Sequence, residues 1–131
     1  MDATTEIAPG IFLVPTISRV TVTPELREIS MAIRGPQGLN IVDGCSHAGV
    51  EKILEAATKN RPAHPGSIWR PPSCGNSRLL TFQRISAALR DQWLDYIAMG
   101  HCTGEPTFAA LQKTFRDRYI YAGVGTVVNI P

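Results

Sequence analysis

The sequence predicts a mixed α/β fold with one hydrophobic core. Its first 43 residues have the short apolar runs and the two-residue alternation of strands, and the apolar spacing after Gly49 becomes helical. The chain has 131 residues, which at about 150 residues per domain is room for a single domain. Hydrophobic residues make up 44% and charged residues 18%, as in globular proteins.

Three strands are expected in the first half. Ile11–Val14 is a short apolar run, and Gly35–Gly38 is a turn signal that joins Leu26–Arg34 to Leu39–Asp43 as a hairpin. Within Leu26–Arg34 the residues alternate between two sides. One side carries Glu28, Ser30, Ala32 and Arg34, and the other carries Ile29, Met31 and Ile33.

Helices and strands alternate in the rest of the chain. The loop Gly44–Gly49 leads into a helix whose apolar face is Val50, Ile53, Leu54 and Ala57. A helical pattern over Gln83–Asp95 precedes a strand at Tyr96–Met99. The next helix starts near Pro106, since proline suits the first turn of a helix, and has the apolar face Phe108, Leu111 and Phe115. Tyr119–Ile130 returns to strand residues, with a bend expected at Gly123 and Gly125.

Residues 60–82 form an anomalous segment. From Lys59 to Arg90 there are six basic residues and no acidic one, while the rest of the chain has seven basic and eleven acidic residues, a net charge of −4. Four of the ten prolines lie within Arg61–Ser73. A long stretch with neither a helical nor a strand period is unusual inside a compact domain.

Composition also excludes several classes of partner and location. The net charge of +2 is too small to indicate a nucleic acid or an anionic membrane as partner. Apolar runs such as Val124–Val128 are far shorter than the roughly 20 residues of a membrane span. The N-terminus lacks the features of a signal peptide, and the three cysteines are an odd number, so we expect a cytoplasmic protein with reduced thiols.

Two histidines occupy equivalent places in the predicted fold. His47 and His101 each lie in a Gly- and Cys-containing loop that follows a strand and precedes a helix, where sites form in α/β proteins. Histidine is the commonest metal ligand, but a catalytic zinc usually takes three protein ligands. Asp43, Cys45 and Cys102 are candidate neighbours of such a site. The alternatives are loop histidines bonded to backbone and small buried thiols.

The motifs resemble those of the metallo-β-lactamase superfamily, and in particular its dihydropterin ribofuranosylaminobenzene phosphate synthase-like branch. The resemblance rests on Val42–Gly49 (VDGCSHAG), Gly100–Gly104 (GHCTG), Glu28–Ile33 and the terminal Ala122–Thr126. It implies that residues 1–131 are the C-terminal portion of a four-layer αββα sandwich domain. It also implies His47 and His101 as ligands of a divalent zinc, manganese or iron ion, and a small-molecule substrate, for which a phosphorylated compound is one candidate. Metal-assisted hydrolase or synthase chemistry would follow.

Two motifs of that superfamily are missing. No HxHxDH occurs, since His47 is the first histidine, and GGxHL should fall within the anomalous segment. Ile68–Ser73 can be encoded ATT TGG CGG CCT CCA TCT, and with the T of Cys74 a shift of one base reads Phe-Gly-Gly-Leu-His-Leu. Our hypothesis is therefore that residues 60–82 are a frameshifted segment.

The resemblance thus predicts an incomplete metal site, little activity of this chain alone and no assigned catalytic residue. The alternative is a non-catalytic remnant or interaction module that binds no metal. Its exposed apolar sheet face would pair with a second copy as a homodimer or with the missing N-terminal half. Anion binding at the helix N-termini after Gly49 and Gly104 is a third hypothesis.

Overall fold

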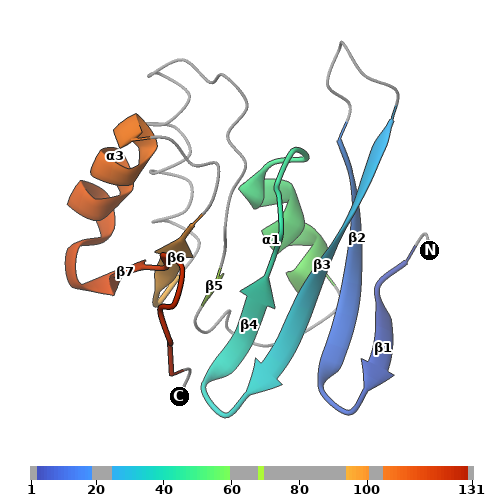
Figure 1. Cartoon of the computed structure of the whole chain (residues 1–131). Coiled ribbons are helices and arrows are strands. Elements are labelled where there is room, and N and C mark those ends of the chain that lie inside the picture. Colours follow the sequence, from blue (N-terminus) through green and yellow to red (C-terminus); the bar gives the residue numbers. More distant parts are fainter. Residues whose placement is uncertain (1–2, 19–24, 60–67, 70–93, 101–104, 130–131) are drawn as a thin grey trace.

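The computed structural model describes residues 3–18, 25–59, 68–69, 94–100 and 105–129. Over these ranges the protein is mixed α/β, as predicted, with an antiparallel sheet, a second sheet of short parallel strands and helices packed against them (Figure 1). The elements are β1 (Thr5–Ala8), β2 (Ile11–Ser18), β3 (Leu26–Gly35), β4 (Gly38–Val42), α1 (Val50–Thr58), β5 (Ile68–Trp69), β6 (Ile97–Met99), α3 (Glu105–Phe115), the 3₁₀ turn η1 (Arg116–Arg118) and β7 (Tyr119–Tyr121).

The antiparallel sheet has the strand order β1-β2-β3-β4. Pro9 and Gly10 connect β1 to β2, and Gly10 has a φ of 78°, the left-handed conformation that a tight turn needs and that glycine adopts without strain. The predicted hairpin is confirmed, since Gly35 pairs with Gly38 and β3 and β4 run antiparallel from that turn. Short turns therefore fix the register within the β1–β2 and β3–β4 pairs, and β2 pairs with β3 along its whole length.

The ends of several strands differ from the prediction. β2 continues past Val14 to Ser18 because it pairs along its whole length with β3, and β1 was not predicted from its mixed sequence TEIA. The expected strand Tyr119–Ile130 is wrong over residues 122–129: β7 ends at Tyr121, and a turn follows at 124–125, while Ile130 lies outside the described residues. Within residues 119–129, and counting partners in the described ranges, strand pairing is limited to Tyr119–Tyr121 with β6.

Helix α1 covers one face of the antiparallel sheet, which we call the inner face. All four predicted apolar positions of the helix are buried, and Ile53 and Leu54 belong to one core cluster with Phe12 and Val14 of β2. In Figure 1 the helix lies behind the sheet, so the viewer looks at the opposite, outer face. Burial of apolar side chains between these two layers stabilises this half of the molecule.

The parallel strands extend the same core. β6 pairs with β5 on one side and with β7 on the other, and β5 lies beside β4 (Figure 1). Leu111 and Phe115 of α3 are buried in the cluster that also contains Ile97 and Met99 of β6. The predicted apolar face of α3 is therefore confirmed.

Most of the anomalous segment lies outside the described residues. Ile68 and Trp69 are its described part, and they form β5. The interior of the predicted helix Gln83–Asp95 also lies outside them, while Leu94 is buried just before β6 and is not helical. No helix in the described part of the chain is long and apolar enough to span a membrane.

Candidate functional site

The inner face of the antiparallel sheet changes from apolar to polar along its strands. One end carries Phe12, Val14, Ala32 and Ile41, which are buried against α1. The other end, nearer the loop before α1, carries Thr16, Ser18, Glu28, Ser30 and Asp43. Burying a polar side chain costs free energy unless it is hydrogen-bonded. Since polar side chains are mostly exposed, a cluster of them at one end of a core face is a candidate functional site.

The loop that precedes α1 is held closely against this polar end. The Gly49 N–H donates to the Ser46 carbonyl at 3.0 Å, which closes a turn around His47 and Ala48. Gly49 has a φ of 97° as it leads into the helix, a conformation that favours glycine. The Ser18 hydroxyl at the end of β2 donates to the His47 carbonyl at 2.9 Å.

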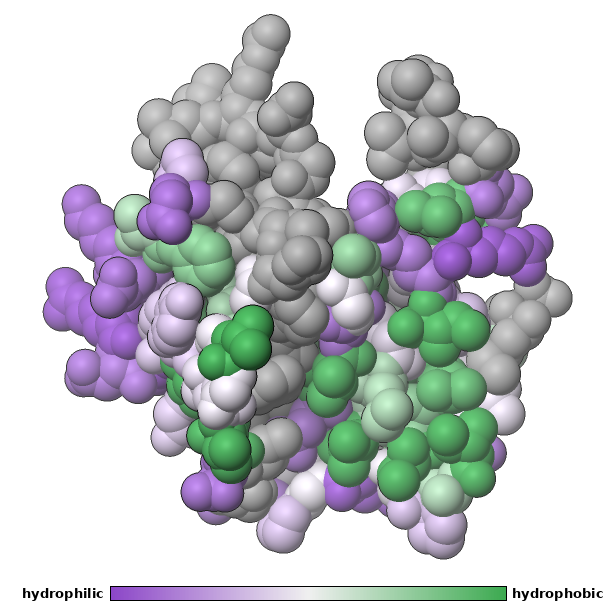
Figure 2. Space-filling view, viewed as in Figure 1, coloured by the Kyte–Doolittle hydropathy of each residue, from purple (hydrophilic) through white to green (hydrophobic). Residues whose placement is uncertain are grey.

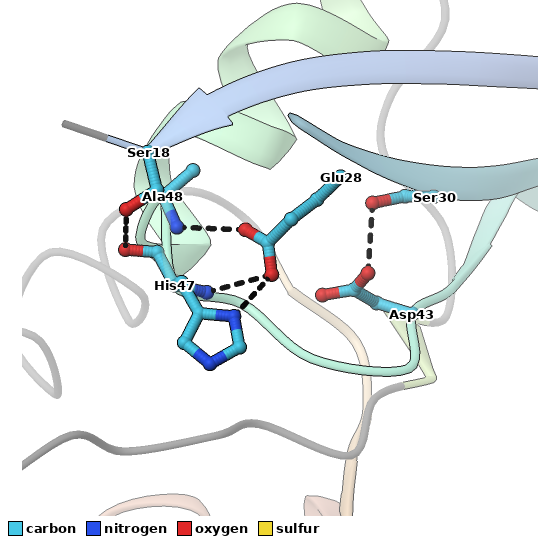
Figure 3. A network of polar contacts seen from close by, with 6 residues as sticks. All are labelled: Ser18, Glu28, Ser30, Asp43, His47 and Ala48. Atoms are coloured by element: carbon cyan, nitrogen blue, oxygen red, sulfur yellow. Dashed lines mark hydrogen bonds and ion pairs between the residues drawn. The ribbon is translucent and has the colours of Figure 1, made fainter. Parts of the chain in front are cut away.

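The Glu28 carboxylate binds that loop through both of its oxygens. One carboxylate oxygen, Oε2, accepts the Ala48 N–H at 2.8 Å, and the other, Oε1, accepts the His47 N–H at 3.1 Å (Figure 3). Oε1 also lies 2.6 Å from Nδ1 of the His47 ring. The Glu28 side chain is 9% exposed, whereas that of His47 is 40% exposed. The carboxylate is therefore buried beneath a histidine that reaches the surface.

This pair determines which nitrogen of His47 can react. A carboxylate only accepts hydrogen bonds, so Nδ1 carries the proton in the contact with Glu28. In the neutral ring Nε2 then has the lone pair, and Figure 3 shows it on the side of the ring away from Glu28. Nε2 can accept a proton or bind a metal ion.

A second buried pair holds the start of the loop. Asp43, which follows β4 and is 2% exposed, accepts a hydrogen bond from the Ser30 hydroxyl at 3.0 Å. Ser30 is completely buried. Asp43 thus fixes the point where the chain leaves the sheet, four residues before His47.

Thr16 is an unsatisfied member of the polar end. It lies directly opposite Glu28 in the β2–β3 register and is 7% exposed. Its Oγ1 is buried and has no hydrogen-bond partner within the described ranges. A buried hydroxyl without a partner costs free energy, and most hydroxyls in protein interiors are hydrogen-bonded.

The predicted site is described only in part. The structure places Asp43, Cys45 and His47 in one loop, with Cys45 half-buried as a free thiol. His101 and Cys102 lie outside the described residues. Among the residues that the structure does describe, no three His, Cys, Asp or Glu side chains come together as a complete metal site.

Glu28 and Ser18 were missed by the sequence analysis as site residues. Both lie on strands, at 19 and 29 residues from the histidine loop, so no local spacing connects them to it. The available signal was the alternation within β3, which puts Glu28 on the same side as Ser30 and Ala32. That side is the inner face.

Comparison with known proteins identifies a solved structure with the same fold. The sequence matches no known family profile and no curated protein. Three chains of known structure match, among them the crystal structure of Tm1679, a metal-dependent hydrolase of the β-lactamase superfamily. The TM-score is 0.83 at 20% sequence identity, over 99% of this chain and 57% of that one. This chain therefore spans a little over half the length of Tm1679 and shares the fold of that part of a β-lactamase-superfamily hydrolase.

Proposed function

We propose that this chain is a divalent-metal-binding domain with the metal-dependent hydrolase chemistry of its structural neighbour, and that His47 is one of its ligands. The observation that carries the proposal is the Glu28–His47 pair, whose Nδ1–Oε1 distance is 2.6 Å. Metal-bound histidines generally donate their other ring N–H to a carboxylate or carbonyl, which fixes the tautomer and raises the basicity of the ligand nitrogen. His47 meets that requirement.

The other donors of the set rest on the motif resemblance. His101 is the second proposed ligand, and Asp43 and Cys45 are proposed neighbours because they precede His47 in the same loop. A bound zinc, manganese or iron ion would polarise a substrate oxygen or activate water. With so few ligands from this chain, we expect weak metal affinity and little hydrolytic activity alone. The dihydropterin-related branch and a phosphorylated small-molecule substrate remain predictions.

Glu28 would act in this site as a positioning residue. Its two oxygens bind both the ring and the backbone of the histidine loop, so they set the direction of Nε2 as well as the tautomer. Loss of an outer-shell partner of this kind typically lowers metal affinity 10- to 100-fold. The Ser30–Asp43 pair would keep the loop in register with the sheet.

Metal titration of matched variants tests the proposal. Purified wild-type protein, stripped with chelator, is titrated with Zn²⁺, Mn²⁺ and Fe²⁺ by competition with a chromogenic chelator, beside His47→Ala, His101→Ala and Glu28→Gln. We expect His47→Ala and His101→Ala to abolish binding and Glu28→Gln to weaken it 10- to 100-fold. His64→Ala is the control, because it removes the third histidine of the chain from the anomalous segment. Absence of binding by the wild type, or equal affinity of wild type and His47→Ala, would overturn the proposal.

A further inference from the structure

The outer face of the antiparallel sheet is largely apolar, and its apolar side chains are half-buried or exposed. Its one buried polar side chain among the described strand residues is Asn40, opposite Ile33. The β2–β3–β4 register places Leu13, Met31 and Val42 in one row across it, and Pro15 and Ile29 in the next. Ile29 is 54% exposed, Met31 39% and Ile17 38%. Figure 2 shows an apolar area at the lower right, over these strands. Its members are Ile11, Leu13, Pro15, Ile17, Ile29, Met31, Ile33 and Val42.

This face inverts the usual arrangement of a two-layer sheet. The residues of β3 that are turned toward α1 include Ser30 and Ala32, whereas its large aliphatic side chains point away from the helix. A one-sided sheet normally turns polar side chains to water. The largest aliphatic side chains of β3 therefore lie on a surface that no described part of the chain covers.

We propose that a second copy of this chain covers the outer face, sheet against sheet, in a symmetric dimer. Sheets pack face to face through such side chains at about 10 Å separation. In a two-fold contact the same patch serves both partners, so it must not repel itself. The outer face meets this condition, because its charged residue, Arg27, lies 3.9 Å from the carboxylate of Glu25, and the remaining members named above are uncharged.

The size of the patch fits a weak dimer. β2 has eight residues at about 3.3 Å each, and three neighbouring strands at about 4.8 Å give on the order of 400 Å² of sheet per copy. Two copies would bury on the order of 800 Å², which is the size of weak, transient protein interfaces and not of stable ones. We therefore expect association in the micromolar range and not an obligate dimer.

Sedimentation velocity over about 5 to 200 µM protein tests this surface. The runs use reducing buffer, because the chain has three cysteines that could crosslink. We expect the wild type to shift from monomer to dimer and no further. The double variant Ile29→Thr/Met31→Thr removes the two most exposed apolar side chains of the outer face, while threonine keeps the preference for strands. Its dimerisation should weaken at least tenfold.

A matched control distinguishes association through the outer face from nonspecific hydrophobic association. Val124→Thr makes the same kind of change at a fully exposed apolar residue in the turn after β7, and it should dimerise like the wild type. Circular dichroism checks that each variant is folded, and Ile17→Thr replaces the double variant if that one unfolds. A monomeric wild type at 200 µM, open-ended oligomers, equal weakening by Val124→Thr, or flotation of the monomer with neutral lipid vesicles would each overturn the proposal.

Discussion

Replacing Glu28 with glutamine perturbs the contact that orients His47. The carboxylate accepts three hydrogen bonds, from the backbone of His47 and Ala48 and from the His47 ring. A glutamine side chain has the same shape but a single acceptor oxygen, so at least one donor would face an NH₂ group. A hydrogen bond to a charged group contributes about 1.5–3 kcal/mol. Because the Glu28 side chain is only 9% exposed, water replaces little of that contribution.

We therefore expect Glu28→Gln to lower the free energy of unfolding by about 2 kcal/mol, and the melting temperature by about 6–10 °C for a chain of this length. Urea unfolding followed by circular dichroism measures the first quantity. Glu25→Gln is the control, at the residue just before the same strand. Glu25 pairs with Arg27 at 3.9 Å with both side chains more than half exposed, and such pairs contribute less than about 1 kcal/mol. The reasoning is refuted if the two variants are equally stable.

Three further changes test the rest of the structure. Ser30→Ala removes a fully buried donor to Asp43 and should cost about 1.5–3 kcal/mol in urea unfolding, so a loss below about 0.5 kcal/mol would contradict the contact. Burial, with smaller effects of Tyr121 and Glu105, raises the pKa of Tyr119 above 10.0. The folded state therefore holds that proton more tightly than the unfolded state, and the associated stability is complete below about pH 10 and is lost as the pH rises through the raised pKa. Tyr119→Phe should remove this loss of stability at alkaline pH. If the melting temperatures of wild type and variant fall equally between about pH 9 and pH 12, the prediction is wrong. Ile53→Ala empties a fully buried position of α1 and should cost about 2–5 kcal/mol, against less than about 0.5 kcal/mol for the exposed Lys52→Ala.

Turn residues and apolar spacing predicted the elements that depend on neighbouring residues in the sequence. The turn between β3 and β4 follows from its flanking glycines, and the apolar spacing of α1 and α3 predicted the helix faces that the core buries. Pairing with distant strands decided the elements that were missed. β1 exists because it adds to the edge of β2, and β7 stops at Tyr121, where its pairing with β6 ends.

In the candidate site, too, the part set by neighbouring residues was predictable and the part set by distant residues was not. The loop Gly44–Gly49 and its histidine could be identified from the sequence, because glycines and a following helical period mark a strand-to-helix connection. Glu28 could not be assigned, since its partner lies 19 residues away and the strand pattern does not say which side faces the core. The apolar side of β3 is the exposed one, so hydrophobicity alone would choose the wrong face.

The NMR signals of the His47 ring nitrogens show directly whether Glu28 holds His47 with Nε2 free to bind a metal ion. Long-range ¹H–¹⁵N correlation spectra of ¹⁵N-labelled protein, recorded before and after addition of Zn²⁺, distinguish a protonated ring nitrogen from one with a free lone pair. We predict that Nδ1 is protonated in the metal-free protein, through its contact with Glu28 Oε1, and that Zn²⁺ shifts the Nε2 signal while Nδ1 keeps its proton. A proton on Nε2 in the metal-free protein, or ring signals that Zn²⁺ leaves unchanged, would contradict it.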